Sequence, residues 1–243
     1  MGNVKMYLWN WKFGLSFHIK NIRKIFTLIN HNIKVINYAA TREVLFENIY
    51  FKYKEFLPDG DGIVFDIGSQ YGDYAIACNK LYGSKLVIAF EPLKRNYRIA
   101  KRNIKLSKAD DSVSVHNVAI SNQQIIGIDN KSMFSNLNNN GELFKPNFIV
   151  LDNLIKKMEC DYTFKIDIIK IDVEGFEMNV LDSAINTIKK YKPKLIIETH
   201  TFDLYKKVSY LLADLGYNLI HKDYNGFNIR FDFVVNNFYL PIN

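Results

Sequence analysis

Cysteine is nearly absent from this sequence, and so are long apolar runs. The two cysteines, Cys78 and Cys160, are too few for a disulfide framework or a cysteine-rich metal cluster. No apolar run approaches the roughly 18 residues that a membrane-spanning helix needs. The first residues carry no secretory signal pattern, and Met6 stands where a myristoylation site requires Ser or Thr. These absences predict a soluble, cytoplasmic protein of a reducing compartment, with no transmembrane segment.

A dense block of basic residues is also missing, although the formal net charge is +7. A positive chain favours anionic partners such as a phosphate-bearing substrate, a nucleic acid or a membrane surface. No run of five or more Lys/Arg residues occurs, which makes nucleic acid an unfavoured partner. A solvated lysine-rich surface is the simpler explanation of the charge.

The apolar share of 48% and the aromatic share of 14% suit a globular protein with a large core. Residues 1–58 are aromatic and basic, and we expect an N-terminal helical extension there, with one helix near 41–56. Residues 59–243 form the main domain in this prediction. Within that domain the Asn-rich segment 122–147 has little periodicity, and it is expected to be an insertion, a lid or a short hairpin.

Short apolar runs alternate with amphipathic stretches from residue 62 onward. This alternation predicts an α/β fold with a mostly parallel sheet and helices on both faces. In such open sheets, ligands bind beyond the carboxyl ends of the strands. The strands are expected at 62–68, 85–92, 112–121, 164–172, 192–200, 218–224 and 227–237, and the helices at 71–83, 93–108, 151–158, 176–191 and 203–217.

Three carboxylates crowd the end of one of these strands in the stretch IIKIDVEGFE, residues 168–177. Buried carboxylates without partners cost free energy, so their place at a strand end calls for a function. Asp172 and Glu174 follow the strand directly, and Gly175 allows the chain to turn into the next helix. We expect both acids to face a catalytic cleft, whereas Glu177 is expected to face solvent or to pair with a lysine.

The stretch VFDIGSQYGDY, residues 64–74, has the glycines of a ligand-binding turn. Gly68 and Gly72 allow positive φ and a close ligand approach between a strand and a helix. The dinucleotide pattern G-x-G-x-x-G fails because Gln70 and Asp73 occupy the other two glycine positions. Asp66 suits a cofactor with a positive end, such as S-adenosylmethionine, better than a pyrophosphate. The expected cofactor contacts in this turn are Asp66, Gly68, Ser69, Gln70, Tyr71 and Gly72.

Acids and amides at later strand ends extend this cofactor site. Glu91 ends the next strand, where an acid can accept both hydroxyls of a ribose. Asn117 and Ala119, at the end of the third strand, can frame an adenine. Asp172 is expected to contribute to cofactor binding as well as to catalysis.

These segments together resemble the FkbM family of S-adenosylmethionine-dependent methyltransferases. The resemblance covers roughly residues 62–223, and it rests on FDIGSQYGDY, AFEP, NVAIS, IKIDVEGFEMNVLDSA and KPKLIIETH. It implies a Rossmann-like class I methyltransferase fold, with a seven-stranded sheet and an antiparallel last strand. It also implies methyl transfer to oxygen, often to a sugar hydroxyl of a glycan or related metabolite. One departure is Gln70, where the family commonly has asparagine.

Methyl transfer to a hydroxyl requires alignment of donor and acceptor and removal of a proton from the oxygen. Asp172 is the first candidate for the base, followed by Glu174. His200, at the end of the neighbouring strand, is the third, because histidine titrates near neutrality. The same three residues can instead hold a divalent cation that lowers the pKa of the hydroxyl. Glu198 is expected only to satisfy loop backbone groups.

Other functions remain open from the sequence. An RNA methyltransferase would suit the basic stretch 93–108, although no RNA-binding module is recognisable. Amino-group methylation lacks the Asn/Asp-Pro-Pro-Tyr type of motif. A methyltransferase fold without activity would serve as a binding protein. Peripheral membrane contact would use Trp9, Trp11, Phe13 and nearby lysines.

Overall fold

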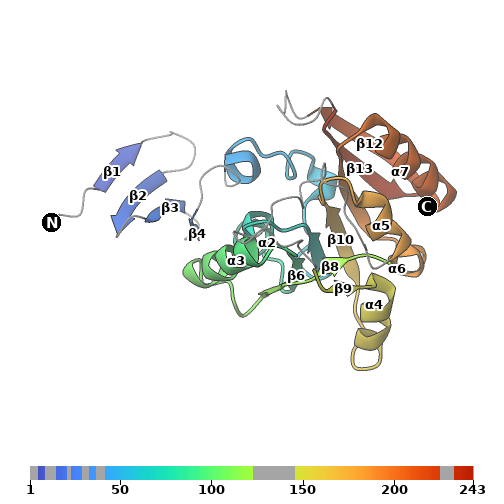
Figure 1. Cartoon of the computed structure of the whole chain (residues 1–243), viewed down its shortest axis with the longest axis horizontal. Helices are drawn as coiled ribbons and strands as arrows, with labels where there is room; N and C mark the ends of the chain where they lie inside the picture. Colours follow the sequence, from blue (N-terminus) through green and yellow to red (C-terminus); the bar gives the residue numbers. More distant parts are fainter. Residues whose placement is uncertain are drawn as a thin grey trace. The chain divides into compact units, whose positions relative to one another are not determined.

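The computed structural model describes residues 5–8, 15–20, 23–28, 33–36, 42–122, 146–224 and 233–242. The chain divides into two compact units, Met1–His116 and Asn117–Asn243. Figure 1 labels most of the helices and strands of both units. Within the described ranges, no helix combines the length and the apolar character that crossing a bilayer requires.

The N-terminal extension contains a four-stranded antiparallel sheet in the order β1-β2-β3-β4. The helical extension predicted for residues 1–58 is wrong in this part. The sequence LSFHIK of one strand alternates apolar and polar residues, which is the period of a strand and not of a helix. The strands are β1 (Lys5–Leu8), β2 (Leu15–Lys20), β3 (Arg23–Leu28) and β4 (Ile33–Val35).

The predicted helix at 41–56 is also wrong, because only two short helical turns form there. They are the π-helical turn η2 (Arg42–Phe46) and the 3-10 turn η3 (Lys54–Phe56). Asn48 has a left-handed φ of +58°, which ends the first turn. Phe51 then stacks on Tyr74 with ring centroids 5.0 Å apart. Packing of aromatic rings therefore overrides the helical spacing in this segment.

The rest of the first unit alternates strands and helices as predicted. Strands β5, β6 and β7 pair in parallel. All residues of β5 and β6 are buried, which is typical of a sheet covered on both faces. The elements are β5 (Ile63–Ile67), α2 (Asp73–Tyr82), β6 (Val87–Phe90), α3 (Lys94–Leu106) and β7 (Val113–His116).

The second unit continues this alternation and ends in an antiparallel pair of strands. Strands β10 and β11 are parallel, while β12 and β13 pair antiparallel. A short parallel pair, β8 with β9, precedes them. The elements are β8 (Ala119–Ile120), β9 (Phe148–Ile149), α4 (Leu151–Glu159), β10 (Ile166–Ile171), α5 (Glu177–Asp182), α6 (Ile185–Tyr191), β11 (Lys194–Thr199), α7 (Phe202–Asp214), β12 (Tyr217–Tyr224) and β13 (Val235–Pro241).

The main sheet has seven strands in the order β12-β13-β11-β10-β5-β6-β7. Strand β13 runs antiparallel to both of its neighbours, β11 and β12. The predicted class I methyltransferase sheet, mostly parallel with an antiparallel last strand, is therefore confirmed.

The helix predicted at 176–191 is divided into α5 and α6. Asp152 on α4 causes the division, because its carboxylate caps the start of α6. It accepts the backbone N–H groups of Asn186 at 3.0 Å and of Thr187 at 2.8 Å. Most of the Asn-rich segment, residues 123–145, and the aromatic residues Trp9, Trp11 and Phe13 lie outside the described residues.

Candidate active site

The loop between β5 and α2 turns sharply because three of its residues adopt left-handed backbone conformations. The φ angle is +81° at Gly68, +48° at Gln70 and +79° at Gly72. Glycine adopts such angles freely, whereas a residue with a side chain pays on the order of 1 kcal/mol. The carbonyl oxygen of Phe90 accepts the N–H groups of Gly68 and Ser69, both at 3.0 Å. The predicted turn is thus formed and is hydrogen-bonded to the end of β6, while its contact with a cofactor stays a prediction.

Glu91 braces this loop from the end of β6, where it is 4% exposed. Its Oε2 accepts the backbone N–H of Gln70 at 2.9 Å, and its Oε1 accepts that of Leu93 at 2.8 Å. Each carboxylate oxygen thus accepts one backbone N–H group. Glu91 therefore supports the strained Gln70 backbone, and its contact with a ribose stays a prediction.

Asn103 on α3 is a supporting residue that the sequence reasoning missed. Its side-chain amide donates to the carbonyl oxygen of Tyr71 at 3.0 Å, while its Oδ1 accepts the N–H of Ile36 at 2.8 Å. Asn103 is fully buried and shares its helix face with Ala100 and Ile104. A lone amide in the apolar stripe of a basic helix is the sequence signal that would have revealed it.

The charge around the loop suits a cofactor that carries a cation and hydroxyl groups. Asp66, Asp73 and Glu91 are all buried, with exposed fractions of 4% or less. Three buried carboxylates would repel a di- or triphosphate. The buried Ser69 Oγ has no hydrogen-bond partner in the described part of the chain, so a bound ligand can use it. These residues fit S-adenosylmethionine, whose ammonium and ribose hydroxyls match the acids.

Asn117 and Ala119, the expected adenine contacts, belong to the second unit. Asn117 is half-buried and directly follows β7. Ala119 begins β8, and its N–H already donates to the carbonyl oxygen of Asn147 at 2.8 Å. Its backbone thus has a structural role in the β8–β9 pair.

The acids after β10 are set by an unusual backbone in the second unit. Glu174 has a φ of +55° and Gly175 one of +103°, so the chain reverses between the strand and α5. Strained positions of this kind concentrate at functional sites. Lys170 is buried on β10, and its Nζ lies 3.5 Å from Oδ2 of Asp172. The buried lysine therefore balances the charge of Asp172.

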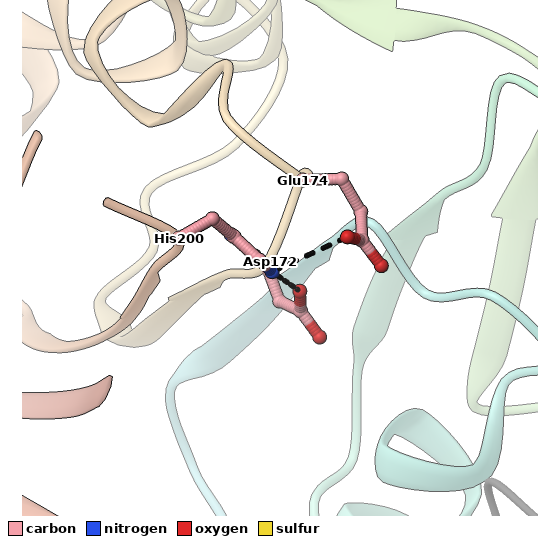
Figure 2. Close-up of side chains that lie close together, drawn as sticks. All are labelled: Asp172, Glu174 and His200. Carbon is pink, nitrogen blue, oxygen red and sulfur yellow. Dashed lines mark ion pairs between the residues drawn. The ribbon is translucent and has the colours of Figure 1, made fainter. Parts of the chain in front are cut away.

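His200 draws the predicted acids together, as Figure 2 shows for Asp172 and Glu174. Its Nε2 lies 3.4 Å from Glu174 Oε2 and 3.9 Å from Asp172 Oδ1. The other ring nitrogen, Nδ1, lies 2.7 Å from Glu177 Oε1, and Nε2 also lies 3.3 Å from Glu198 Oε1. We call these five residues, Asp172, Glu174, Glu177, Glu198 and His200, the carboxylate–histidine cluster.

Two members of this cluster were assigned other roles from the sequence. Glu177 was expected to face solvent or a lysine, but it is fully buried and holds His200. Its Oε1 also accepts the N–H of Gly175 at 2.9 Å, which closes the strand-to-helix turn. Glu198 was expected to serve only the loop backbone, but it contacts the imidazole. An acid at a helix start is usually exposed, so only the tertiary structure could place Glu177 inward.

Burial and neighbouring charges shift the pKa values of His200 and Glu174 in this cluster. Burial opposes the charged form of His200, but hydrogen bonds to Glu177 and Glu198 and the charge of Asp172 outweigh it and raise its pKa to about 11. Burial, followed by repulsion from Asp172, raises the pKa of Glu174 to about 7. Burial and Asp172 also raise the pKa of Glu198. At neutral pH, His200 is thus an imidazolium, and Glu174 exchanges its proton readily.

The cluster can also hold a metal ion by its geometry alone. One ligand atom from each of Asp172, Glu174 and His200 lies within 4.8 Å of the other two. Two carboxylates and an imidazole are a donor set that several divalent cations accept. A salt-bridged imidazolium is the alternative state of the same groups, and it requires no ion.

We expect Glu177→Ala to lower the free energy of unfolding by about 3 kcal/mol, because the Nδ1–H of the buried His200 imidazolium and the N–H of Gly175 both lose their acceptor. Glu177→Gln keeps an oxygen acceptor and should cost less. Denaturant unfolding at pH 7 measures both changes. Asp203→Ala, at an exposed ion pair with Lys207, is the control and should cause no measurable change. A Glu177→Ala protein as stable as this control would contradict the structural role of Glu177.

The sequence profile of the methyltransferase FkbM domain matches residues 66–219, which is more than half of the chain. A comparison with curated proteins finds no match. The match contains the β5–α2 loop, Glu91 and the whole carboxylate–histidine cluster. The resemblance noted from the sequence is therefore confirmed.

Solved structures share the fold at low sequence identity. Methyltransferase FkbM from Methylobacillus flagellatus is 20% identical, with a TM-score of 0.54, over 78% of this chain and 47% of that one. The M. jannaschii tRNA m1G37 methyltransferase is 13% identical, with a TM-score of 0.50, over 96% of this chain and 56% of that one. The chain thus spans about half the length of these two proteins. By its profile match and its fold, the chain belongs to the methyltransferase FkbM family.

Proposed function

We propose that this protein transfers a methyl group from S-adenosylmethionine to a hydroxyl oxygen of its acceptor. The observation that carries the proposal is the carboxylate–histidine cluster, in which Glu174 has a pKa of about 7. Removing a hydroxyl proton calls for a base whose pKa lies near the working pH. Family membership supports the cofactor.

In this proposal the residues of the first unit bind and orient the cofactor. The β5–α2 loop provides a close backbone approach at Gly68 and Gly72, and Glu91 accepts the ribose hydroxyls. Asp66 balances the positive end of the cofactor. The bound cofactor supplies an electrophilic methyl group on a sulfonium. Transfer then needs only alignment and a path for the acceptor proton.

Glu174 is the base in this mechanism, in place of Asp172, which the sequence ranked first. Asp172 is balanced by Lys170, and His200 already carries a proton at neutral pH. Glu174 is 31% exposed, so it can reach an acceptor hydroxyl. His200 orients the carboxylates and stabilises the charge that remains on them. In this mechanism Glu174 accepts the proton, and His200 is the cation that positions it.

For the acceptor we propose a sugar hydroxyl, as the FkbM resemblance implies. RNA is the second candidate, because α3 presents an uninterrupted basic face. Six exposed cationic residues lie on this helix and would suit phosphates, namely Lys94, Arg95, Arg98, Lys101, Arg102 and Lys105. A tRNA methyltransferase among the structures of similar fold is compatible with this alternative.

Gly72→Ala should weaken S-adenosylmethionine binding at least tenfold, because a side chain is strained at φ +79° and relief of that strain would shift the loop that is proposed to approach the cofactor. Gly83→Ala is a matched control at the other end of α2. Its φ is +75°, and no heavy atom lies within 4 Å of the added Cβ. Both variants should lose similar stability, of the order of 1 kcal/mol. Calorimetric titration separates them, and equal cofactor affinity in the two variants would argue against the loop as the cofactor site.

The activity is tested with methyl-labelled S-adenosylmethionine and three acceptor pools: free sugars, nucleotide-sugars and unmodified tRNA. Label in an alkali-stable methyl ether of a sugar would support the proposal. Label in tRNA would favour the alternative. Cofactor binding without transfer to any pool would indicate a binding protein with a methyltransferase fold.

A further inference from the structure

Four aromatic rings gather on the second unit outside the carboxylate–histidine cluster. Phe202 is 54% exposed and Tyr224 is 67% exposed. Phe233 lies between them, with its ring centroid 5.5 Å from that of Phe202 and 6.1 Å from that of Tyr224. Tyr205 lies 5.9 Å from Phe233 by the same measure. We call Phe202, Tyr205, Tyr224 and Phe233 the aromatic patch. Large exposed rings that adjoin one another are costly in water and commonly mark a binding surface.

The strand register places this patch near the carboxyl end of β11, where His200 also lies. On β13, Val235 is paired with Thr199 of β11 and with Tyr224 of β12. His200 follows Thr199 directly, and Phe202 begins α7 two residues later. Figure 1 shows α7, β12 and β13 together in the C-terminal part of the chain. The patch therefore lies close in the chain and in the sheet to His200, which contacts the proposed base Glu174.

Two lysines give the patch a positive charge. Lys222 Nζ lies 3.8 Å from the centroid of the Tyr205 ring and 5.0 Å from that of Tyr224. Lys206 Nζ lies 4.6 Å from the centroid of Phe202. Cations held over aromatic faces keep their charge and remain available to an anion. The surface thus combines apolar ring area with cations.

We propose that the aromatic patch is the acceptor subsite, and that it holds a pyranose ring bearing an anionic group such as a phosphate or carboxylate. The proposal rests on the proposed function for the identity of the reacting group, a hydroxyl. Aromatic faces are electron-rich and attract the polarised C–H bonds on one face of a sugar. Lys206 and Lys222 select the anionic substituent.

The rings of the patch do not share one plane. Tyr224 stands at 88° to Phe233, and Phe202 stands at 71° to it. Phe202 and Tyr205 are nearer to parallel, with 24° between their planes. A puckered sugar has C–H bonds in several directions and can contact rings that stand at steep angles, whereas a flat base stacks on one plane, so uridine serves as the competing probe.

Saturation-transfer NMR on the full chain tests this subsite with glucose 6-phosphate, glucuronic acid, methyl β-glucoside and uridine as probes. We expect a larger saturation-transfer signal for the two anionic sugars, glucose 6-phosphate and glucuronic acid, than for the neutral methyl β-glucoside. Phe202→Ala and Tyr224→Ala should each weaken binding of glucose 6-phosphate about three- to tenfold. Tyr210→Ala is the matched control, because Tyr210 lies on the same helix, is 71% exposed and is outside the patch. Lys222→Gln should remove most of the preference for the anionic probes, whereas Lys207→Gln should preserve it.

Three results would overturn the proposal. The first is a wild-type protein that gives no saturation-transfer signal for any of the sugars. The second is a set of patch variants that bind glucose 6-phosphate as well as the Tyr210→Ala control does. The third is a signal for uridine that depends on the patch, with no signal for the sugars. Titration of S-adenosylmethionine into the same samples keeps the two proposals apart. Intact cofactor binding with any of these results refutes the subsite alone, whereas loss of cofactor binding in wild type refutes the proposed function.

Discussion

Glu174→Gln is expected to reduce turnover by about 10²- to 10⁴-fold, which is the usual contribution of a general base. Affinity for S-adenosylmethionine should stay close to that of wild type, because the role proposed for Glu174 is to take the acceptor proton and not to bind the cofactor. The wild-type rate should rise with pH and level off above about 7, where Glu174 loses its proton. In Glu174→Gln this rise should disappear. The dependence of initial rate on pH in both proteins measures it.

Asp172→Asn is the comparison variant for this prediction. It removes a neighbouring charge that raises the pKa of Glu174, so the pH profile should move to lower pH while substantial activity remains. A Glu174→Gln protein with near wild-type turnover would contradict the assignment of the base. Loss of all turnover in Asp172→Asn alone would restore Asp172 as the base.

The raised pKa of Glu174 also has a consequence for stability. Its folded pKa of about 7 lies above its ordinary value of 4.5, so the folded state holds this proton more tightly than the unfolded chain does. The associated stability is fully present below pH 4.5 and is lost as the pH rises through 7. Glu174→Gln removes this loss, so at pH 8 it should be more stable than wild type by the order of 1 kcal/mol. The proposed role as base would explain why the chain keeps an acid that stability alone would not select.

Glu91→Ala should abolish measurable cofactor binding and cost about 2–4 kcal/mol of stability. The reason is that two backbone N–H groups, those of Gln70 and Leu93, lose their buried acceptor. The strained loop then also loses the contact that holds Gln70. Calorimetric titration measures the affinity, and denaturant unfolding measures the stability.

Glu91→Gln is the control because it keeps the side-chain shape and one oxygen acceptor. Its cofactor affinity should fall between those of wild type and Glu91→Ala. Both titrations are made below the unfolding transition, so that only folded protein is compared. Wild-type affinity in a folded Glu91→Ala protein would mean that Glu91 has a structural role alone.

The sequence predicted those parts of the molecule that depend on local pattern. The strand–helix alternation from residue 62 gave the class of sheet, because buried parallel strands read as short apolar runs. The turn at Gly68 and Gly72 was predicted because positive φ restricts the residue type. The acids after β10 were predicted to be functional because buried carboxylates need a reason.

The sequence prediction failed where tertiary contacts decide. The division between α5 and α6 depends on Asp152, which lies far away in the sequence and caps the second helix. Glu177 occupies a helix start, where acids usually face water, and only the position of His200 turns it inward. The choice of base stays a prediction. We propose Glu174 ahead of Asp172, because burial and neighbouring charges set the protonation states of Glu174 and His200.

The most direct test of the central claim is calorimetric titration of S-adenosylmethionine into the wild-type chain. We predict saturable binding with one site per chain, and competition by S-adenosylhomocysteine, which shares the ribose and the ammonium. If neither compound gives a binding heat, and equilibrium dialysis with labelled cofactor also shows no binding, the claim that the chain binds S-adenosylmethionine is contradicted. The chain would then have a methyltransferase fold that does not bind the cofactor.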